Sequence, residues 1–109
     1  MNLDQLRSFV EVASQGHFTR AAEALHLAQP SLSRQISTLE QDLGAPLFNR
    51  TPGRVALTDA GESLLPLARR MLADADSVRR EMAVLADLQR EDELGVLYID
   101  TVVEPWLGF

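Results

Sequence analysis

Side chains that could bind DNA bases gather in one stretch of this sequence. No acidic residue lies between Glu23 and Glu40, and the stretch contains Arg34 among serine, threonine, glutamine and histidine residues. Short hydroxyl groups and a guanidinium form hydrogen bonds at close range, as recognition of base edges in the major groove requires. Without carboxylates, the stretch would not repel phosphates. It is therefore a candidate surface for binding double-stranded DNA.

Helical spacing places these polar residues opposite an apolar stripe. Pro30 is suited to a first helical position, and Gly44 with Pro46 ends the helix. The apolar residues that share one stripe are Leu32, Ile36, Leu39 and Leu43. The polar residues on the other face or beside it are Ser31, Ser33, Arg34, Ser37, Thr38 and Gln41. Taken alone, this pattern also fits an ordinary solvated helix face.

Two further helices are predicted before this one. The first runs from about Leu3 to Ser14, with Asn2 as its N-cap and Gly16 as its stop. The second is short, is capped by Thr19 and ends near Leu25. Residues 26–28 then join it to the polar helix, which makes a helix-turn-helix.

A β-hairpin is predicted from Leu47 to Leu57, with a turn at residues 52–53 of sequence Pro-Gly. Arg50 and Arg54 flank that turn. Arginines near a hairpin tip beside a helix-turn-helix could reach phosphates or a narrow minor groove. Solvated loop arginines are the alternative interpretation.

A long helix is predicted from Asp59 to about Leu88 or Gln89, with Thr58 as its cap and a bend at Pro66. Its apolar positions alternate in steps of four and three residues, which is the pattern of a coiled-coil seam. These positions are Leu64, Ala68, Met71, Ala75, Val78, Met82 and Leu85. Because the small domain before this helix could not cover such a seam, the simplest partner is a second copy of the chain.

Composition limits the remaining functions. The net charge is −6, but ten of the sixteen acidic residues follow Ala60, so the acidity lies mostly outside the predicted DNA-binding half. With no cysteine and only His17 and His26, no metal site or cofactor is expected. No transmembrane run or signal peptide occurs, which favours a cytoplasmic protein of one small domain. The serines lack the histidine and acid arrangement of a hydrolase, so an enzyme is not expected.

The elements in this order resemble the N-terminal module of bacterial LysR-type transcription regulators, from Met1 to about Gln89. The resemblance is carried by five segments. They are Leu6-x-x-Phe9; Gly16-His17-Phe18-Thr19-Arg20-Ala21-Ala22-x-x-Leu25; Gln29-Pro30-Ser31-Leu32-Ser33-Arg34-Gln35-Ile36-x-x-Leu39-Glu40; Leu43-Gly44-x-x-Leu47-Phe48-x-Arg50; and Leu57-Thr58-x-Ala60-Gly61.

The resemblance implies that the helix with the Gln-Pro-x-x-Ser pattern enters the major groove. The DNA contacts expected from the resemblance and the face analysis together are Thr19, Arg20, Gln29, Pro30, Ser31, Ser33, Arg34, Ser37, Thr38, Arg50 and Arg54. Two residues depart from the family pattern, since His17 and Ala28 stand where Ser is frequent. Because Ala28 cannot cap the following helix, the free energy of DNA binding is expected to weaken by about 1 kcal/mol or less.

The expected fold is mostly α: a winged helix-turn-helix over residues 1–58 and a dimerisation or linker helix over 59–89. Residues 90–109 are expected to hold a polar hinge and, in the strand-like run 97–103, the start of an effector-binding domain. The resemblance implies an antiparallel homodimer on a palindromic site, with higher oligomers in a full-length regulator. It also implies that a small-molecule effector would bind only in the larger domain.

Two other classes remain as alternatives. A winged-helix module for dimerisation or protein interaction, without DNA binding, would keep the same fold. The acid-free helix face argues against that module. An enzyme is a distant third, because no phosphate-binding glycine loop or catalytic constellation is found.

Overall fold

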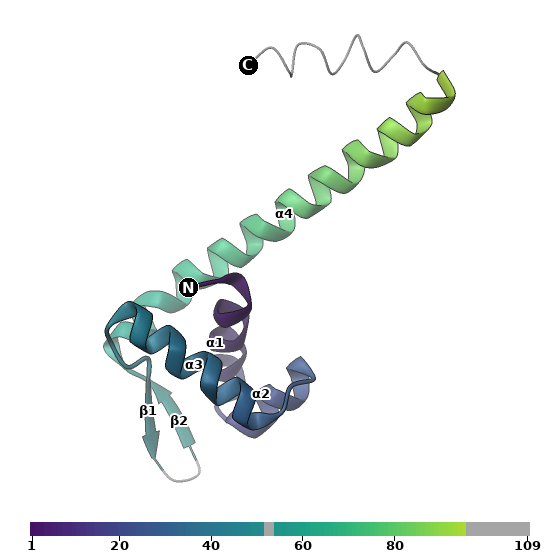
Figure 1. The fold of residues 1–109 in the computed structure, drawn as a ribbon. Helices are drawn as coiled ribbons and strands as arrows, with labels where there is room; N and C mark the ends of the chain where they lie inside the picture. The colour runs from purple at the N-terminus through teal and green to yellow at the C-terminus, as the bar shows by residue number, and fades with distance from the viewer. Residues whose placement is uncertain (52–53, 96–109) are drawn as a thin grey trace. The chain divides into compact units, whose positions relative to one another are not determined.

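The computed structural model describes residues 1–51 and 54–95, with side chains of the last helix described to Arg90. The order of elements is three helices, a two-stranded hairpin and a long helix (Figure 1). Their bounds are α1 Leu3–Gln15, α2 Phe18–Leu25, α3 Gln29–Leu43, β1 Phe48–Thr51, β2 Arg54–Leu57 and α4 Asp59–Gly95. The predicted Pro-Gly turn at 52–53 and the predicted strand at 97–103 lie outside the described residues.

The chain divides into two units, Met1–Ala73 and the part from Asp74 onward, and α4 contributes to both. The first unit holds the helix-turn-helix, the hairpin and the first turns of α4. We call α1–α3 together with the hairpin the head. Among the residues that the structure describes, no helix is both long and apolar enough to cross a bilayer.

Helix α1 has the ends that the sequence predicts. The Asn2 side chain accepts a hydrogen bond from the Gln5 backbone at 2.8 Å, and the Gln5 side chain accepts one from the Asn2 backbone at 3.1 Å. Gly16 ends the helix in the left-handed region at φ 71°. This capping box satisfies N–H groups that the first turn cannot pair internally.

The start of α2 differs from the prediction. His17, not Thr19, is the N-cap, and the N–H of Ala21 donates to its carbonyl at 3.1 Å. Thr19 therefore lies in the first helical turn and is exposed. The cause is Gly16, which ends α1 and leaves only one extended residue before the chain turns into α2. The predicted link of residues 26–28 is confirmed, and His26 adopts a left-handed conformation at φ 56°.

Helix α3 begins at Gln29, so Pro30 occupies the second helical position rather than the first. Its N-cap is Ala28, which has no side-chain group to offer the first turn. Ser31 and Leu32 donate to the Ala28 carbonyl at 3.0 and 3.1 Å, which completes the turn with backbone alone. Gly44 at φ 74° ends the helix as predicted.

The predicted hairpin is present as an antiparallel pair in which Arg50 faces Val55 and Thr51 faces Arg54. Backbone hydrogen bonds attach the hairpin to the rest of the head. The N–H of Val55 donates to the Gly16 carbonyl at 3.3 Å, and the N–H of Thr58 donates to the Leu47 carbonyl at 3.0 Å. We call the two strands β1 and β2 the wing.

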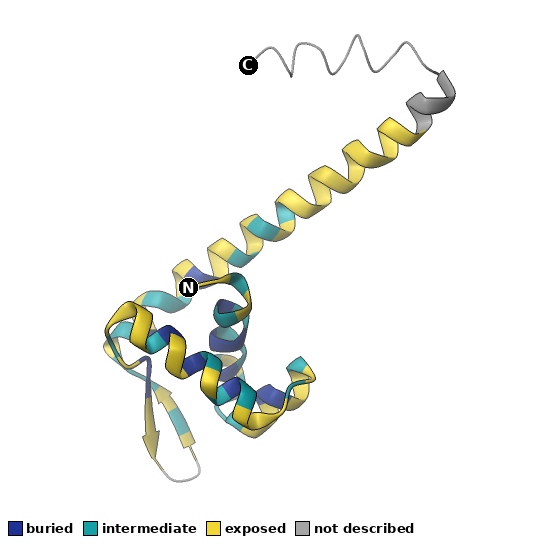
Figure 2. Ribbon diagram, in the orientation of Figure 1, coloured by how far each residue is buried: buried dark blue, intermediate teal, exposed yellow. Residues whose placement is uncertain are grey.

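All three helices of the head contribute to one hydrophobic core (Figure 2). Its buried residues are Leu6, Phe9, Val12, Ala21, Ala22, Leu32, Ile36, Leu39, Leu47, Phe48 and Ala68. The Phe48 ring lies 5.4 Å from that of Phe9 and 6.1 Å from that of Phe18, centroid to centroid. Aromatic pairs at such separations add to the stabilisation that burial supplies. The wing therefore shares the core of the helices.

Helix α4 begins as predicted and ends later. The N–H of Gly61 donates to the Thr58 hydroxyl at 3.1 Å, which is the expected cap. Pro66 lies inside the helix, where it cannot donate to a preceding carbonyl. The helix continues to Gly95, so the predicted hinge at 90 is wrong for residues 90–95. Arginine and glutamate have high helix propensity, so the polar run that begins at Arg90 does not by itself end a helix.

The predicted dimerisation seam requires a correction at its first two positions. Ala68 is 0% exposed within the head core, and Leu64 packs partly buried against the same core. Met71, Val78, Met82 and Leu85 are instead exposed. The head therefore covers the first turns of α4 by itself, because small Ala68 permits close approach of the helix. Leu67, which the seam pattern omitted, is also exposed.

Candidate nucleic-acid interface

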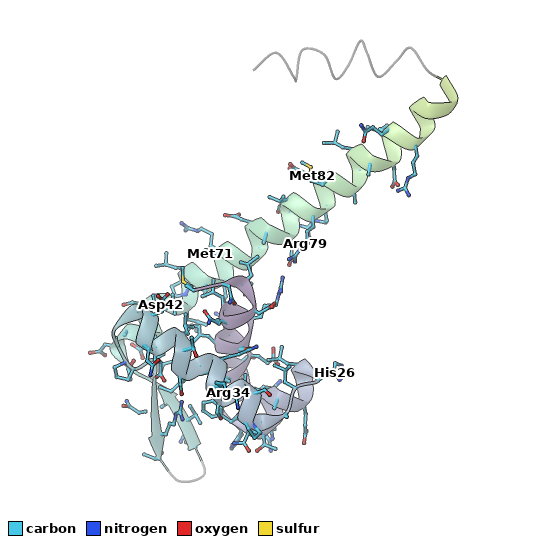
Figure 3. All side chains as sticks on the ribbon, viewed as in Figure 1. His26, Arg34, Asp42, Met71, Arg79 and Met82 are labelled. Atoms are coloured by element: carbon cyan, nitrogen blue, oxygen red, sulfur yellow. The ribbon has the colours of Figure 1, made fainter. Side chains whose placement is uncertain are left out.

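The outer face of α3 carries the polar residues that the sequence placed there. Arg34, labelled in Figure 3, is exposed together with Ser37 and Thr38. Ser31 and Ser33 are half-buried at the edges of this face. Buried Leu32, Ile36 and Leu39 hold the opposite side of α3 in the core. The helix is thereby fixed by its apolar stripe while its hydrogen-bonding face stays open.

The N-terminal end of α3 is electrostatically suited to an anion. Gln29 and Pro30 are exposed there, and the first turn contains no acidic residue. Helix N-termini carry a partial positive charge from unpaired N–H groups. With Ala28 as the cap, no side-chain oxygen from that residue competes for those groups.

A hollow of about 510 Å³ joins α2, α3 and the wing. The predicted DNA-binding residues that line it are Thr19, Arg20, Gln29 and Arg54. Of these, Thr19 and Arg20 come from the first turn of α2, and Arg54 from the start of β2. Residues 35 positions apart in the sequence therefore lie around one concave surface. Two guanidinium groups there favour a phosphate of the DNA backbone.

His17 and Thr51 also line this hollow and were missed as site residues. The predicted cap at Thr19 would leave His17 outside the second helix, whereas His17 directly precedes the first turn of α2. Thr51 is the last residue of β1, where its hydroxyl donates to the Arg54 carbonyl at 3.2 Å. In a hairpin with a two-residue turn, Thr51 must lie opposite Arg54, and this pairing is the sequence signal that could have identified Thr51 as a site residue. Glu23 is the acid among the described lining residues.

Arg50 lies in a different setting from Arg54. Its Nη2 atom is 3.6 Å from Oε1 of Glu40, and its guanidinium lies 4.7 Å from the ring centroid of Phe18. Arg50 is thus engaged by groups of α3 and α2, and the described hollow does not include it. Its prediction as a DNA contact on the same footing as Arg54 is not supported by this geometry.

No cluster of metal-binding side chains occurs among the residues that the structure describes. The candidate site is instead made of hydrogen-bonding groups and guanidinium groups on two helices and a wing. Such an arrangement can bind a polyanion and form hydrogen bonds with it.

Comparison with known proteins agrees with this arrangement. Residues 3–62 match the family described as "Bacterial regulatory helix-turn-helix protein, lysR family". The chain is 45% identical over 105 residues to the transcriptional regulator ClcR of Pseudomonas putida, covering 94% of this chain and 35% of ClcR. It is 51% identical over 77 residues to the transcriptional regulator BudR of Klebsiella aerogenes, covering 71% and 54%. The chain thus spans about a third to a half of these relatives.

Solved structures give the same result for the fold. The crystal structure of BenM_DBD with catB site 1 DNA matches with a TM-score of 0.76 and 38% identity, covering 79% of this chain and 97% of that one. The CbnR_DBD–DNA complex matches with a TM-score of 0.75 and 38% identity, covering 79% and 99%. By the match over residues 3–62, this chain belongs to the LysR family of bacterial regulatory helix-turn-helix proteins.

Proposed function

We propose that this chain is the double-stranded DNA-binding module of a LysR-type transcription regulator and acts as a homodimer on a palindromic site. The observation that carries the proposal is the exposed polar face of α3, without acidic residues from Gln29 to Leu39, beside a hollow lined by Arg20 and Arg54. Support also comes from the similar structures, BenM_DBD and CbnR_DBD, which were solved as complexes with DNA.

In this proposal α3 enters the major groove and its outer face meets base edges. Arg34 can form a bidentate hydrogen bond with guanine, and Ser33 and Thr38 can bond to several bases. The seven contact candidates on this helix are Gln29, Pro30, Ser31, Ser33, Arg34, Ser37 and Thr38. Their short side chains require α3 to lie deep in the groove, so sequence discrimination depends on its placement.

The hollow binds the phosphate backbone in this proposal. Thr19 and Arg20 lie at the N-terminal turn of α2, where unpaired N–H groups add partial positive charge. Arg54 approaches from the wing. Contacts of this kind fix the orientation of a protein on the duplex without distinguishing sequences.

Homodimerisation is supported by the exposed apolar residues of α4. In the second unit, Val78 is 55% exposed, Met82 48% and Leu85 40%. Large apolar side chains at three- and four-residue steps on an exposed helix are typical of a helix-pairing surface. A second copy of the chain fits because a palindromic DNA site requires two-fold related recognition helices. We propose an antiparallel pairing through Met71, Ala75, Val78, Met82 and Leu85.

Titration of a labelled random-sequence duplex with the chain tests DNA binding. Fluorescence anisotropy should show an affinity that falls steeply as salt rises, because arginine–phosphate contacts release counterions. A variant that removes both of these charges, Arg20→Gln with Arg54→Gln, should have a shallower salt dependence. Absence of binding at low salt would contradict the proposal and favour a module for protein interaction.

A further inference from the structure

Glu40, near the C-terminal end of α3, uses both of its carboxylate oxygens. Oε2 accepts a 2.7 Å hydrogen bond from the backbone N–H of Leu47, just before β1. Oε1 lies 3.6 Å from Nη2 of Arg50, on β1. The Glu40 side chain is 18% exposed and that of Arg50 46%, so the carboxylate is largely shielded while the guanidinium stays partly solvated. The helix proposed to enter the groove therefore holds the start of the wing at two points.

Arg50 extends this connection to α2. Its guanidinium lies over the ring of Phe18, the first residue of α2, at 4.7 Å from the centroid. Stacking on an aromatic face and pairing with a carboxylate together orient the planar guanidinium. We call Glu40, Arg50 and Phe18 the bracket, because they connect α3, β1 and α2 through side chains alone.

The bracket lies close to the proposed phosphate contact of the wing. Arg50 and Thr51 are adjacent on β1, and Thr51 pairs across the hairpin with Arg54. Arg54 lines the hollow together with Thr19 and Arg20 of α2. The backbone N–H of Val55, next to Arg54, donates to the Gly16 carbonyl just before α2. Because the bracket adds side-chain contacts from β1 to α2 and α3, it helps to set the distance between Arg54 and the first turn of α2.

We propose that Glu40 is a positioning residue for DNA binding, which places the wing so that Arg54 contacts phosphate, and that Arg50 acts through the bracket rather than on DNA. This inference rests on the proposed DNA-binding function. It assigns a role to a carboxylate that electrostatics alone would make unfavourable, because an acid beside the interface repels phosphates.

Glu40→Gln separates the two roles of the carboxylate. Glutamine keeps an oxygen that can accept from the Leu47 N–H, and it removes the charge that pairs with Arg50. If Glu40 were only a negative charge near DNA, the variant would bind DNA more tightly. If Glu40 positions the wing, the variant binds more weakly and loses a phosphate contact.

The experiment measures affinity for a random-sequence duplex against salt concentration for the chain, Glu40→Gln, Arg54→Ala and the double variant. One phosphate contact contributes about 0.9 to the slope of log affinity against log salt, or about eightfold in affinity between 1 M and 0.1 M. We expect each single variant to lower the slope by about one and the double variant to lower it by about one as well. A loss of about two in the double variant, or tighter binding by Glu40→Gln, would overturn the proposal.

A second set of variants tests Arg50, and it keeps the proposal testable if Glu40→Gln fails to fold. Arg50→Leu keeps an apolar stem beside Phe18 and removes the ion pair. Combined with Arg54→Ala, it should again lower the slope by about one, whereas a loss of about two would make Arg50 itself a phosphate contact. Asp42→Asn, which removes an acid of α3 that pairs with the N-terminal amine instead of the wing, should leave the slope unchanged. If the unaltered chain fails to bind the duplex at low salt, the proposed function fails before this inference is tested.

Discussion

The α-carbon of Gly61 on α4 lies against the backbone carbonyl of Leu47, so closely that a methyl group at Gly61 would overlap it. The same methyl group would lie 2.8 Å from Cδ2 of Leu57. Gly61 is helical and buried, so its role is close packing of α4 on the wing rather than an unusual backbone conformation. The absence of a side chain there allows Thr58 to cap α4 while donating to the Leu47 carbonyl.

Gly61→Ala should therefore destabilise the head despite the higher helix propensity of alanine. Overlap with a backbone atom cannot be relieved by a rotamer change, and overpacking of this kind costs about 1–3 kcal/mol. Chemical denaturation followed by circular dichroism measures the free energy of unfolding. Ser63→Ala, at an exposed position of the same helix, should change it by less than about 0.5 kcal/mol. Equal stability of both variants would show that the contact is not tight in solution.

Ala28→Ser should stabilise the chain. Ala28 is the N-cap of α3 in an extended conformation at φ −70° and ψ 141°, from which a serine hydroxyl can accept from the first turn. The expected gain in free energy of unfolding is about 0.5–1 kcal/mol. Thermal unfolding measures the difference, with Ala24→Ser at an exposed position in the last turn of α2 as the control. That control should be neutral or slightly destabilising, and a gain of the same size there would argue against capping.

Local signals predicted most of the head, because caps and apolar periodicity act over a few residues. Asn2 with Gln5, Gly16, Gly44 and Thr58 each end or begin a helix where the sequence indicates. Thr19 was misplaced as a cap because threonine is favoured there. The position of Gly16, three residues earlier, had already determined where α2 could start.

Contacts between distant residues were the part that local patterns could not supply. Ala68 fits a heptad seam by spacing, but its small size lets α4 pack on the head and bury it. Arg50 and Arg54 look equivalent around a turn, whereas Glu40 and Phe18 engage Arg50. Seven of the proposed DNA contacts lie on one helix and could be predicted together. The hollow that joins Thr19, Arg20 and Arg54 depends on tertiary packing.

Arg34→Ala should reduce sequence discrimination. If Arg34 bonds to a guanine edge, its loss costs about 1–3 kcal/mol on the preferred duplex and much less on random DNA. The preferred duplex can be obtained by repeated selection from a random-sequence pool with the unaltered chain. Arg54→Ala serves as the matched control and should weaken binding to both duplexes similarly. An equal loss on both duplexes for Arg34→Ala would reassign Arg34 to the phosphate backbone.

Val78→Asp should dissociate the proposed homodimer. Val78 is exposed in the single chain, so the substitution leaves the isolated fold intact, but pairing would bury an unpaired carboxylate from each copy. The expected cost is several kcal/mol, on the order of the penalty for burying an unpaired charge. Sedimentation velocity should then show monomers, and affinity for a palindromic duplex should fall with the loss of the second recognition helix.

The control for this change is Val84→Asp. Val84 is exposed on the same helix to a similar degree. Six residues further along, it lies about 120° around the helix axis from Val78, away from the proposed pairing surface. This variant has the same added charge and the same loss of valine, so it should remain a dimer with unchanged affinity for DNA. Dissociation by Val84→Asp with a stable Val78→Asp dimer would place the interface on the other side of α4. Dissociation by both variants would mean that added charge, rather than a specific apolar surface, controls association.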